Sequence, residues 1–174
     1  MNRFLIEHHT DAIAKSLCDQ HIVKMPLEEA QMLCTTVWHH APEYAEKHEL
    51  YKPAYHKHPC TKWAMETRAN FVFAYNLYIA MLQEYTHRYG RFHGAGNPST
   101  TNPLARPQHI IHARKYIPDG PLTPHPQCFS GYDDCKTDEQ WPIEAYRAFY
   151  IVDKMKFARY NKGRDMPKWM RSAA

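Results

Sequence analysis

The chain has 174 residues, of which 44% are hydrophobic and 23% charged, and its formal net charge is +4. These values are typical of a folded domain and exclude a chain that is disordered throughout. No apolar run approaches the ~18 residues of a membrane span. The N-terminus turns polar too early for a secretory signal peptide. Five scattered cysteines predict reduced thiols. We therefore expect one domain over residues 1–174, located in the cytoplasm and not in a membrane.

The positive charge is concentrated near the C-terminus. Between Arg147 and Arg171 the net charge is +6, whereas the rest of the chain carries −2. This asymmetry is typical of a surface that binds a polyanion such as nucleic acid. A mildly basic tail is also common in proteins that bind none, so charge alone leaves both interpretations open.

The first predicted helical region covers residues 10–40. Pro26 lies inside it and allows two alternatives, because a proline breaks a helix interior but is favourable in a first turn. Either one helix is kinked near Met25, or a new helix begins at Pro26. In the second case Glu28 and Glu29 lie in a first turn, where the helix dipole favours anions by roughly 0.3–1 kcal/mol.

Two further helices and long coil complete the predicted fold. Residues 41–59 are predicted as an ordered loop, and apolar residues at three- and four-residue steps predict a helix over 61–89 that ends before Gly90. The segment 91–142 holds most of the 13 prolines and predicts coil. A last helix is expected over 142–161. The predicted fold class is all-α, with three main helices and long proline-rich coil.

His21, Lys24 and Glu28 are the candidate catalytic residues. His21 and Glu28 lie seven residues apart, so on a helix they project within about 20° of each other, with Lys24 on nearly the same face. An imidazole, an amine and a carboxylate together can perform acid–base or nucleophilic chemistry. The alternative is a half-exposed helix face whose charges pair with one another for a few tenths of a kcal/mol.

The 13 histidines and five cysteines raise the question of a metal. His56, His58 and Cys60 supply possible ligands, as do Cys18 and His21, but neither group has the spacing of a tetrahedral zinc motif. Cys128 and Cys135 have no second pair of ligands. Glycine-rich phosphate loops are also absent. The sequence therefore predicts no metal and no cofactor.

The segment Leu17–Glu28 resembles the catalytic helix of the phage-type pyrimidine-dimer DNA glycosylases, the endonuclease V class of T4-like phages. The shared signature is Asp19-Gln20-His21 with Glu28 seven residues after the histidine. The Asn70-Phe71-Val72-Phe73 helix and the basic, aromatic tail over 154–169 agree in character. The segment from Cys18 is also similar to a motif of small tailed-phage proteins, C-D-x-H-V-V-K-M-x-x-E.

The resemblance implies a compact, metal-free, all-α domain that bends double-stranded DNA and flips a base out of the helix. In that family the α-amine of an N-terminal threonine attacks the sugar C1′, and the resulting imine undergoes β-elimination. A glutamate stabilises the developing sugar cation and handles protons. Glu28 matches that glutamate, and His21 matches a histidine of the family's site. A phage-encoded member would work in the host cytoplasm.

The chain departs from the family pattern at the nucleophile. Asn2 stands at the position of the threonine, and Leu27 and Gln31 stand where the family has arginines. Lys24 is the natural substitute amine, because a lysine that is buried beside His21 could form a Schiff base. The leading prediction is a DNA glycosylase and abasic-site lyase acting on a pyrimidine nucleotide. The alternatives are a phage DNA base-modifying transferase that lacks the lyase step and a non-catalytic DNA-binding protein.

The expected partner is double-stranded DNA, bound by a monomer. Basic residues of the C-terminal third are expected to contact its phosphates: Lys154, Lys156, Arg159, Lys162, Arg164 and Lys168. An interface through Arg106, Arg114 and Lys115 of the long loop is the alternative position.

Overall fold

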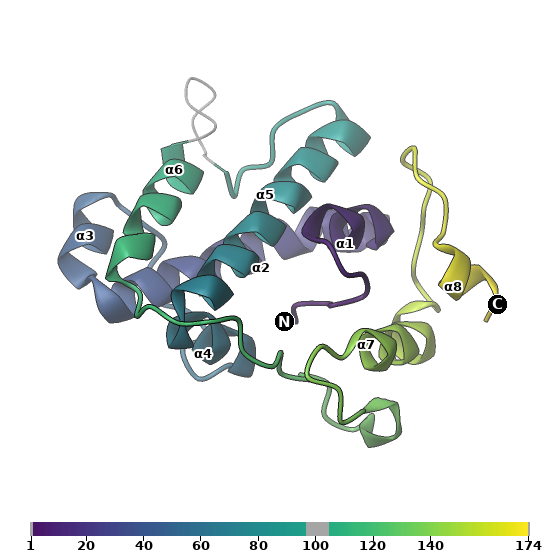
Figure 1. Ribbon diagram of the computed structural model, residues 1–174. Helices are drawn as coiled ribbons and strands as arrows, with labels where there is room; N and C mark the ends of the chain where they lie inside the picture. Colours follow the sequence, from purple (N-terminus) through teal and green to yellow (C-terminus); the bar gives the residue numbers. More distant parts are fainter. Residues whose placement is uncertain (1, 97–104, 174) are drawn as a thin grey trace.

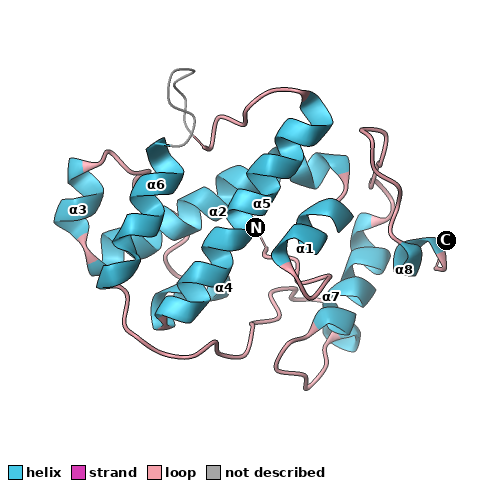
Figure 2. Cartoon of the chain, turned by 45° about the horizontal axis from the view of Figure 1, so that its top comes forward, coloured by secondary structure: helices cyan, strands magenta, loops and turns pink. Residues whose placement is uncertain are grey.

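The computed structural model describes residues 2–96 and 105–173, which form helices and coil without any strand (Figures 1 and 2). The all-α prediction is confirmed for this part of the chain. None of the helices in these ranges is long and apolar enough to cross a lipid bilayer.

The predicted helix over 10–40 is two helices, α1 (Thr10–Ser16) and α2 (Asp19–His40). The break falls at Leu17 and Cys18, which are extended and fully or almost fully buried. The backbone N–H of Cys18 donates to the hydroxyl of Tyr150 at 3.0 Å. This contact with a distant residue thus satisfies the N–H of Cys18, which in a continuous helix would donate to a carbonyl of the same helix.

Pro26 lies inside α2, and the helix continues through it. A new helix beginning at Pro26 is therefore wrong, and Glu28 and Glu29 lie in the middle of α2 rather than in a first turn. The proline removes one backbone hydrogen bond. Packing of α2 against α4 and α5 holds the helix together on both sides of it.

The predicted 41–59 loop contains a short helix, α3 (Pro42–Lys47), and the predicted 61–89 helix is also two, α4 (Pro59–Glu66) and α5 (Arg68–Tyr89). Thr67 separates them, and its hydroxyl oxygen caps α5 by accepting the N–H of Asn70 at 3.1 Å. Gly90, with φ +65°, ends α5 as predicted.

The segment predicted as coil over 91–142 contains three short helical elements: α6 (Ala105–His112), η1 (Ala113–Tyr116) and η2 (Asp133–Cys135). Residues 97–104 of that segment lie outside the described residues. Between η1 and η2 the chain runs as coil past α4 toward the C-terminal helices (Figure 1).

The predicted helix over 142–161 is shorter. It consists of α7 (Ile143–Phe149) and a π-helical turn, η3 (Tyr150–Lys154), and a last short helix, α8 (Lys168–Arg171), follows after coil. The π-helical turn ends at Lys154 because residues a few positions later bind the start of α2. The N–H of Asp19 donates to the carbonyl of Arg159 at 2.8 Å, and the N–H of Asn161 donates to the Asp19 carboxylate at 2.7 Å.

The two long helices, α2 and α5, pack against each other and belong to both parts of the core (Figure 1). One cluster of buried side chains joins the first part of α2 to α1, α7 and the end of α5. The other joins the second part of α2 to α4, α6 and the start of α5. The N-terminal segment Asn2–Ile6 is buried in this framework, with Leu5 and Ile6 completely inaccessible.

Candidate active site

A pocket of about 240 Å³ lies where the N-terminal segment, α2, the coil before η2 and the α7–η3 helix meet. His21, Lys24 and Glu28 all line it, and Asn2 and Lys154 contribute from opposite ends of the chain. The three residues that the sequence singled out are thus brought together in one cavity. Sequence reasoning placed Lys154 only on a DNA-binding surface and missed its position here.

Glu28 presents a carboxylate with one free oxygen. The residue is only 7% exposed. Its Oε1 lies 3.1 Å from the ammonium of Lys24, one helical turn earlier. Its Oε2 is buried and has no hydrogen-bond partner among the residues that the structure describes. Buried carboxylate oxygens normally have partners, so this oxygen is available to a group that enters the pocket.

His21 is held between aromatic rings. It stacks on Phe4 with ring centroids 4.6 Å apart, and its Nδ1 lies 2.8 Å from the hydroxyl of Tyr150. Burial, with a smaller contribution from the Lys154 and Lys24 ammonium groups, lowers the pKa of His21 to about 3. The imidazole is therefore neutral near pH 7 and serves as a hydrogen-bonding group rather than a cation.

Among the described residues, two lysine amines reach the pocket, and they differ in exposure. The side chain of Lys24 is 66% exposed, so burial does not supply the desolvation that the substitute-amine hypothesis assumed. The side chain of Lys154 is 20% exposed and pairs with Asp153. Its ammonium lies 5.0 Å from the centroid of the Phe149 ring and 5.8 Å from that of Phe4. Lys154 is therefore the more enclosed of the two cations.

Asn2 anchors the N-terminal segment at the edge of the pocket. Its amide nitrogen donates to the carbonyl of Cys128 at 2.9 Å, and its amide oxygen accepts the hydroxyl proton of Tyr146 at 3.0 Å. The residue at the position of the family's threonine is thus at the site, but its side chain is fixed by structural hydrogen bonds.

Beneath the pocket lies an ion pair that sequence reasoning did not find. Arg3 and Glu29 are both fully buried and make several hydrogen bonds to each other, and Arg3 also donates to the carbonyl of Cys60 at 3.2 Å. Glu29 therefore serves to hold the N-terminal segment, while its neighbour Glu28 faces the pocket. Adjacent residues on a helix point in different directions. The sequence could therefore have predicted that Glu28 and Glu29 have different roles.

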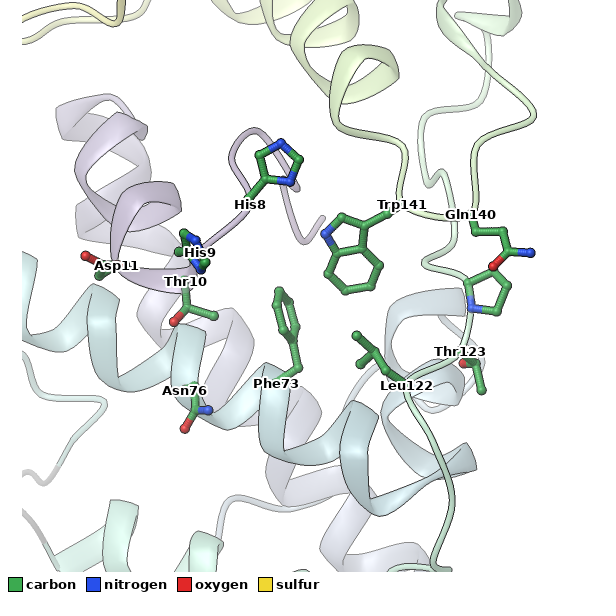
Figure 3. Close-up of a pocket in the computed structure, with 11 residues that line it drawn as sticks. His8, His9, Thr10, Asp11, Phe73, Asn76, Leu122, Thr123, Gln140 and Trp141 are labelled. Atoms are coloured by element: carbon green, nitrogen blue, oxygen red, sulfur yellow. The ribbon is translucent and has the colours of Figure 1, made fainter.

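A larger cavity of about 700 Å³ lies elsewhere, between the start of α1, α5 and the coil around Thr123 and Trp141 (Figure 3). Phe73 on α5 and Trp141 form its aromatic side, with ring centroids 5.0 Å apart. None of its lining residues also lines the Glu28 pocket. The smaller pocket is the candidate active site because, of these two, it alone combines a carboxylate, an imidazole and two lysine amines.

The six basic residues expected to bind DNA occupy different environments. Lys154 is in the pocket, and Arg164 binds both carboxylate oxygens of Glu84 at 2.8 and 2.9 Å. This pairing raises the pKa of Arg164. The other four are exposed: Lys156, Arg159, Lys162 and Lys168. Of the six, these four are therefore the ones best placed to reach a phosphate.

The sequence model of the pyrimidine dimer DNA glycosylase family matches residues 1–95, which is more than half of the chain. The chain belongs to this family, and the predicted resemblance is confirmed. Comparisons with curated proteins and with solved structures gave no significant match. The family acts on DNA, so DNA is the partner of this protein. The matched part extends from the N-terminus through α5 and includes Glu28, His21 and Lys24.

Proposed function

We propose that this protein is a DNA N-glycosylase that acts on a pyrimidine nucleotide in double-stranded DNA, with Glu28 as the central carboxylate. The observation that carries the proposal is the buried, unpartnered Oε2 of Glu28 in a pocket of a chain that belongs to a DNA glycosylase family. A monomer in the cytoplasm is the form we expect to act.

The chemistry follows from the charges in the pocket. A nucleotide flipped out of the duplex would enter between His21 and Glu28. As the bond from the base to C1′ breaks, positive charge develops on the sugar, and a carboxylate oxygen with no other partner can stabilise it. The neutral imidazole of His21 can hydrogen-bond the departing base without adding positive charge next to the sugar cation.

A lyase step requires an amine that attacks C1′ and forms an imine. Asn2 stands at the position of the family's threonine and would supply an α-amine only if Met1 were removed. We propose Lys24 for this role because its ammonium lies 3.1 Å from Glu28, which can accept the amine proton. Lys154 is a second amine in the same pocket. The α-amine of Met1, which lies outside the described residues, is the third candidate.

Borohydride trapping on a duplex with an abasic site tests this step. Reduction of an imine should cross-link the protein to DNA, and peptide mapping should place the adduct at Lys24. Lys24→Arg keeps the positive charge but forms no stable imine, so it should abolish trapping. Lys154→Arg and the exposed Lys15→Arg serve as matched controls. An adduct at Lys154 or Met1 would reassign the nucleophile.

A DNA base-modifying transferase is the second candidate function. The replacement of the family's threonine by Asn2 favours it, and so does the cavity of about 700 Å³ beside Phe73 and Trp141, which has room for a small-molecule donor. Absence of trapping at any amine, together with tight DNA binding and a small molecule detected by native mass spectrometry, would support this candidate. Absence of both trapping and a bound donor would favour a non-catalytic DNA-binding protein.

A further inference from the structure

Three side chains that are possible metal ligands converge behind the wall of the Glu28 pocket. One ligand atom each of His58, Cys60 and Cys128 lies within 4.8 Å of the other two. His58 is the N-cap of α4, and Cys60 lies in its first turn, completely buried. Cys128 comes from the coil before η2 and also lines the pocket.

The distance between the two sulfurs indicates what they are arranged to do. Their Sγ atoms are 3.4 Å apart. Two thiolates on a tetrahedral zinc, each with a Zn–S bond of about 2.3 Å, lie ~3.8 Å apart. A disulfide would bring them to about 2.05 Å. The observed separation is much closer to the zinc geometry, so a small movement of either side chain would complete it.

Two buried sulfurs this close together suit a divalent cation. The charge of the metal replaces the protons that the sulfurs would otherwise carry, and so it stabilises both thiolates in a buried place.

The charges around the three residues do not oppose a cation. Arg3 reaches the cluster through the Cys60 carbonyl, but its charge is balanced by the buried carboxylate of Glu29. Two thiolates and a neutral imidazole would bring the charge of a divalent ion to zero. Sulfur ligands with one imidazole favour zinc over magnesium or calcium.

We propose that His58, Cys60 and Cys128 bind a zinc ion, with the fourth tetrahedral position taken by water or another non-protein ligand. Zinc would join the start of α4 to the coil that carries Cys128 and thereby fix one wall of the Glu28 pocket. The carbonyl of Cys128 accepts the Asn2 side chain, so the same link would steady the N-terminal segment. The sequence predicted no metal because the third ligand lies 68 residues from Cys60, outside any recognised zinc spacing.

The test uses the full-length protein, first stripped with a chelator and then titrated with Co²⁺ alone under reducing conditions. Thiolate ligands should produce a sulfur-to-cobalt charge-transfer band that saturates at one equivalent, and Zn²⁺ should displace it. Cys60→Ser, Cys128→Ser and His58→Ala should each abolish or strongly weaken the band. Cys135→Ser and His56→Ala are matched controls, because both alter neighbouring residues outside the cluster and should keep it.

Circular dichroism of each variant shows whether it folds. If Cys60→Ser unfolds because Cys60 is buried, the half-exposed Cys128→Ser decides the result. A folded wild-type protein without a cobalt band would overturn the proposal, as would a band that persists in Cys128→Ser. A Cys60–Cys128 disulfide that forms in air, with no cobalt binding after reduction, would show a redox pair instead. Since none of these readouts uses DNA, failure here leaves the proposed glycosylase function untouched.

Discussion

The region matched by the family and the region after it contribute differently to the site. Residues 1–95 supply Glu28, His21 and Lys24, which lie within about two turns of a single helix. The later region supplies Tyr150, which binds His21, and Lys154, which encloses the pocket. The comparison teaches that residues 1–95 hold all three candidate catalytic side chains, whereas the part that the family model does not match adds a hydrogen-bond partner for His21 and a second lysine to the pocket.

The largest effect is expected from a substitution within residues 1–95, the part of the chain that the family model matches. Glu28→Gln keeps the shape and removes the charge, so turnover on duplex DNA containing pyrimidine dimers should fall ~10²-fold or more. Stability should change by less than about 1 kcal/mol, because Oε2 has no partner and Oε1 pairs only with the exposed Lys24. Single-turnover cleavage and thermal melting measure the two quantities. The control is Glu43→Gln, on the exposed side of α3. Equal turnover of Glu28→Gln and wild type would remove Glu28 from the mechanism.

The next effect tests whether burial keeps His21 neutral. The pKa of His21 is lowered to about 3 in the folded protein, but is near 6.5 in the unfolded chain. Between these values the unfolded state binds more protons. The stability that His21 contributes is therefore complete above pH 6.5 and decreases as the pH falls toward 3, by up to about 1.4 kcal/mol per pH unit.

Urea unfolding of wild type and His21→Asn at several pH values between 7 and 4 measures this contribution. The stability advantage of the wild type should shrink as the pH falls, because the asparagine does not titrate. The exposed His8→Asn is the control for the histidine-to-asparagine change itself. A constant difference for His21→Asn would mean that the ring titrates normally in the folded protein.

A third substitution removes one of the contacts between the two regions. Tyr150→Phe deletes the hydroxyl that binds Nδ1 of His21 and accepts the N–H of Cys18. Two buried polar groups would then lack a partner, which should lower the free energy of unfolding by about 1–3 kcal/mol. Tyr116→Phe, at a tyrosine that is 43% exposed, is the matched control. If urea unfolding shows equal midpoints for both variants, the two regions are not coupled through Tyr150.

The features that could be predicted from the sequence are those that depend on the spacing of residues close together along the chain. Helical periodicity identified the long helices, and Gly90 correctly marked the end of one of them. His21, Lys24 and Glu28 could be grouped because a seven-residue separation on one helix determines their direction, wherever that helix lies in the fold.

What the sequence could not predict depends on contacts between distant residues. The break at Leu17–Cys18 reflects the hydrogen bond between Cys18 and Tyr150, which are 132 residues apart. The early end of the helix after Lys154 reflects the bonds of Asp19 to the backbone near Asn161. The same limit applies to charges: a count of basic residues cannot show that Arg164 is bound to Glu84 while its neighbour Lys162 is exposed.

The smallest expected effect per residue concerns the exposed basic side chains of the later region. Replacing Lys156, Arg159, Lys162 and Lys168 by glutamine should weaken DNA binding. It should also flatten the dependence of log K on log salt by about 0.9 for each phosphate that the variant no longer neutralises. Arg164→Gln is the comparison variant. Because Arg164 already binds Glu84, its replacement should reduce stability and change the salt slope little.

Fluorescence anisotropy with a labelled duplex at several salt concentrations measures the slope, and urea unfolding measures stability. A fourfold variant with an unchanged slope would place the interface elsewhere. A triple variant at Arg106, Arg114 and Lys115 would then have the flattened slope. Partners within the protein do not decide between the two positions. Arg106 donates to the Tyr51 hydroxyl and Arg114 to the carbonyl of Ile111, while Lys156 pairs with Asp153 and Arg159 donates to the carbonyl of Ala158. Charge favours the C-terminal position, because the net charge from Arg147 to Arg171 is +6 whereas the rest of the chain carries −2.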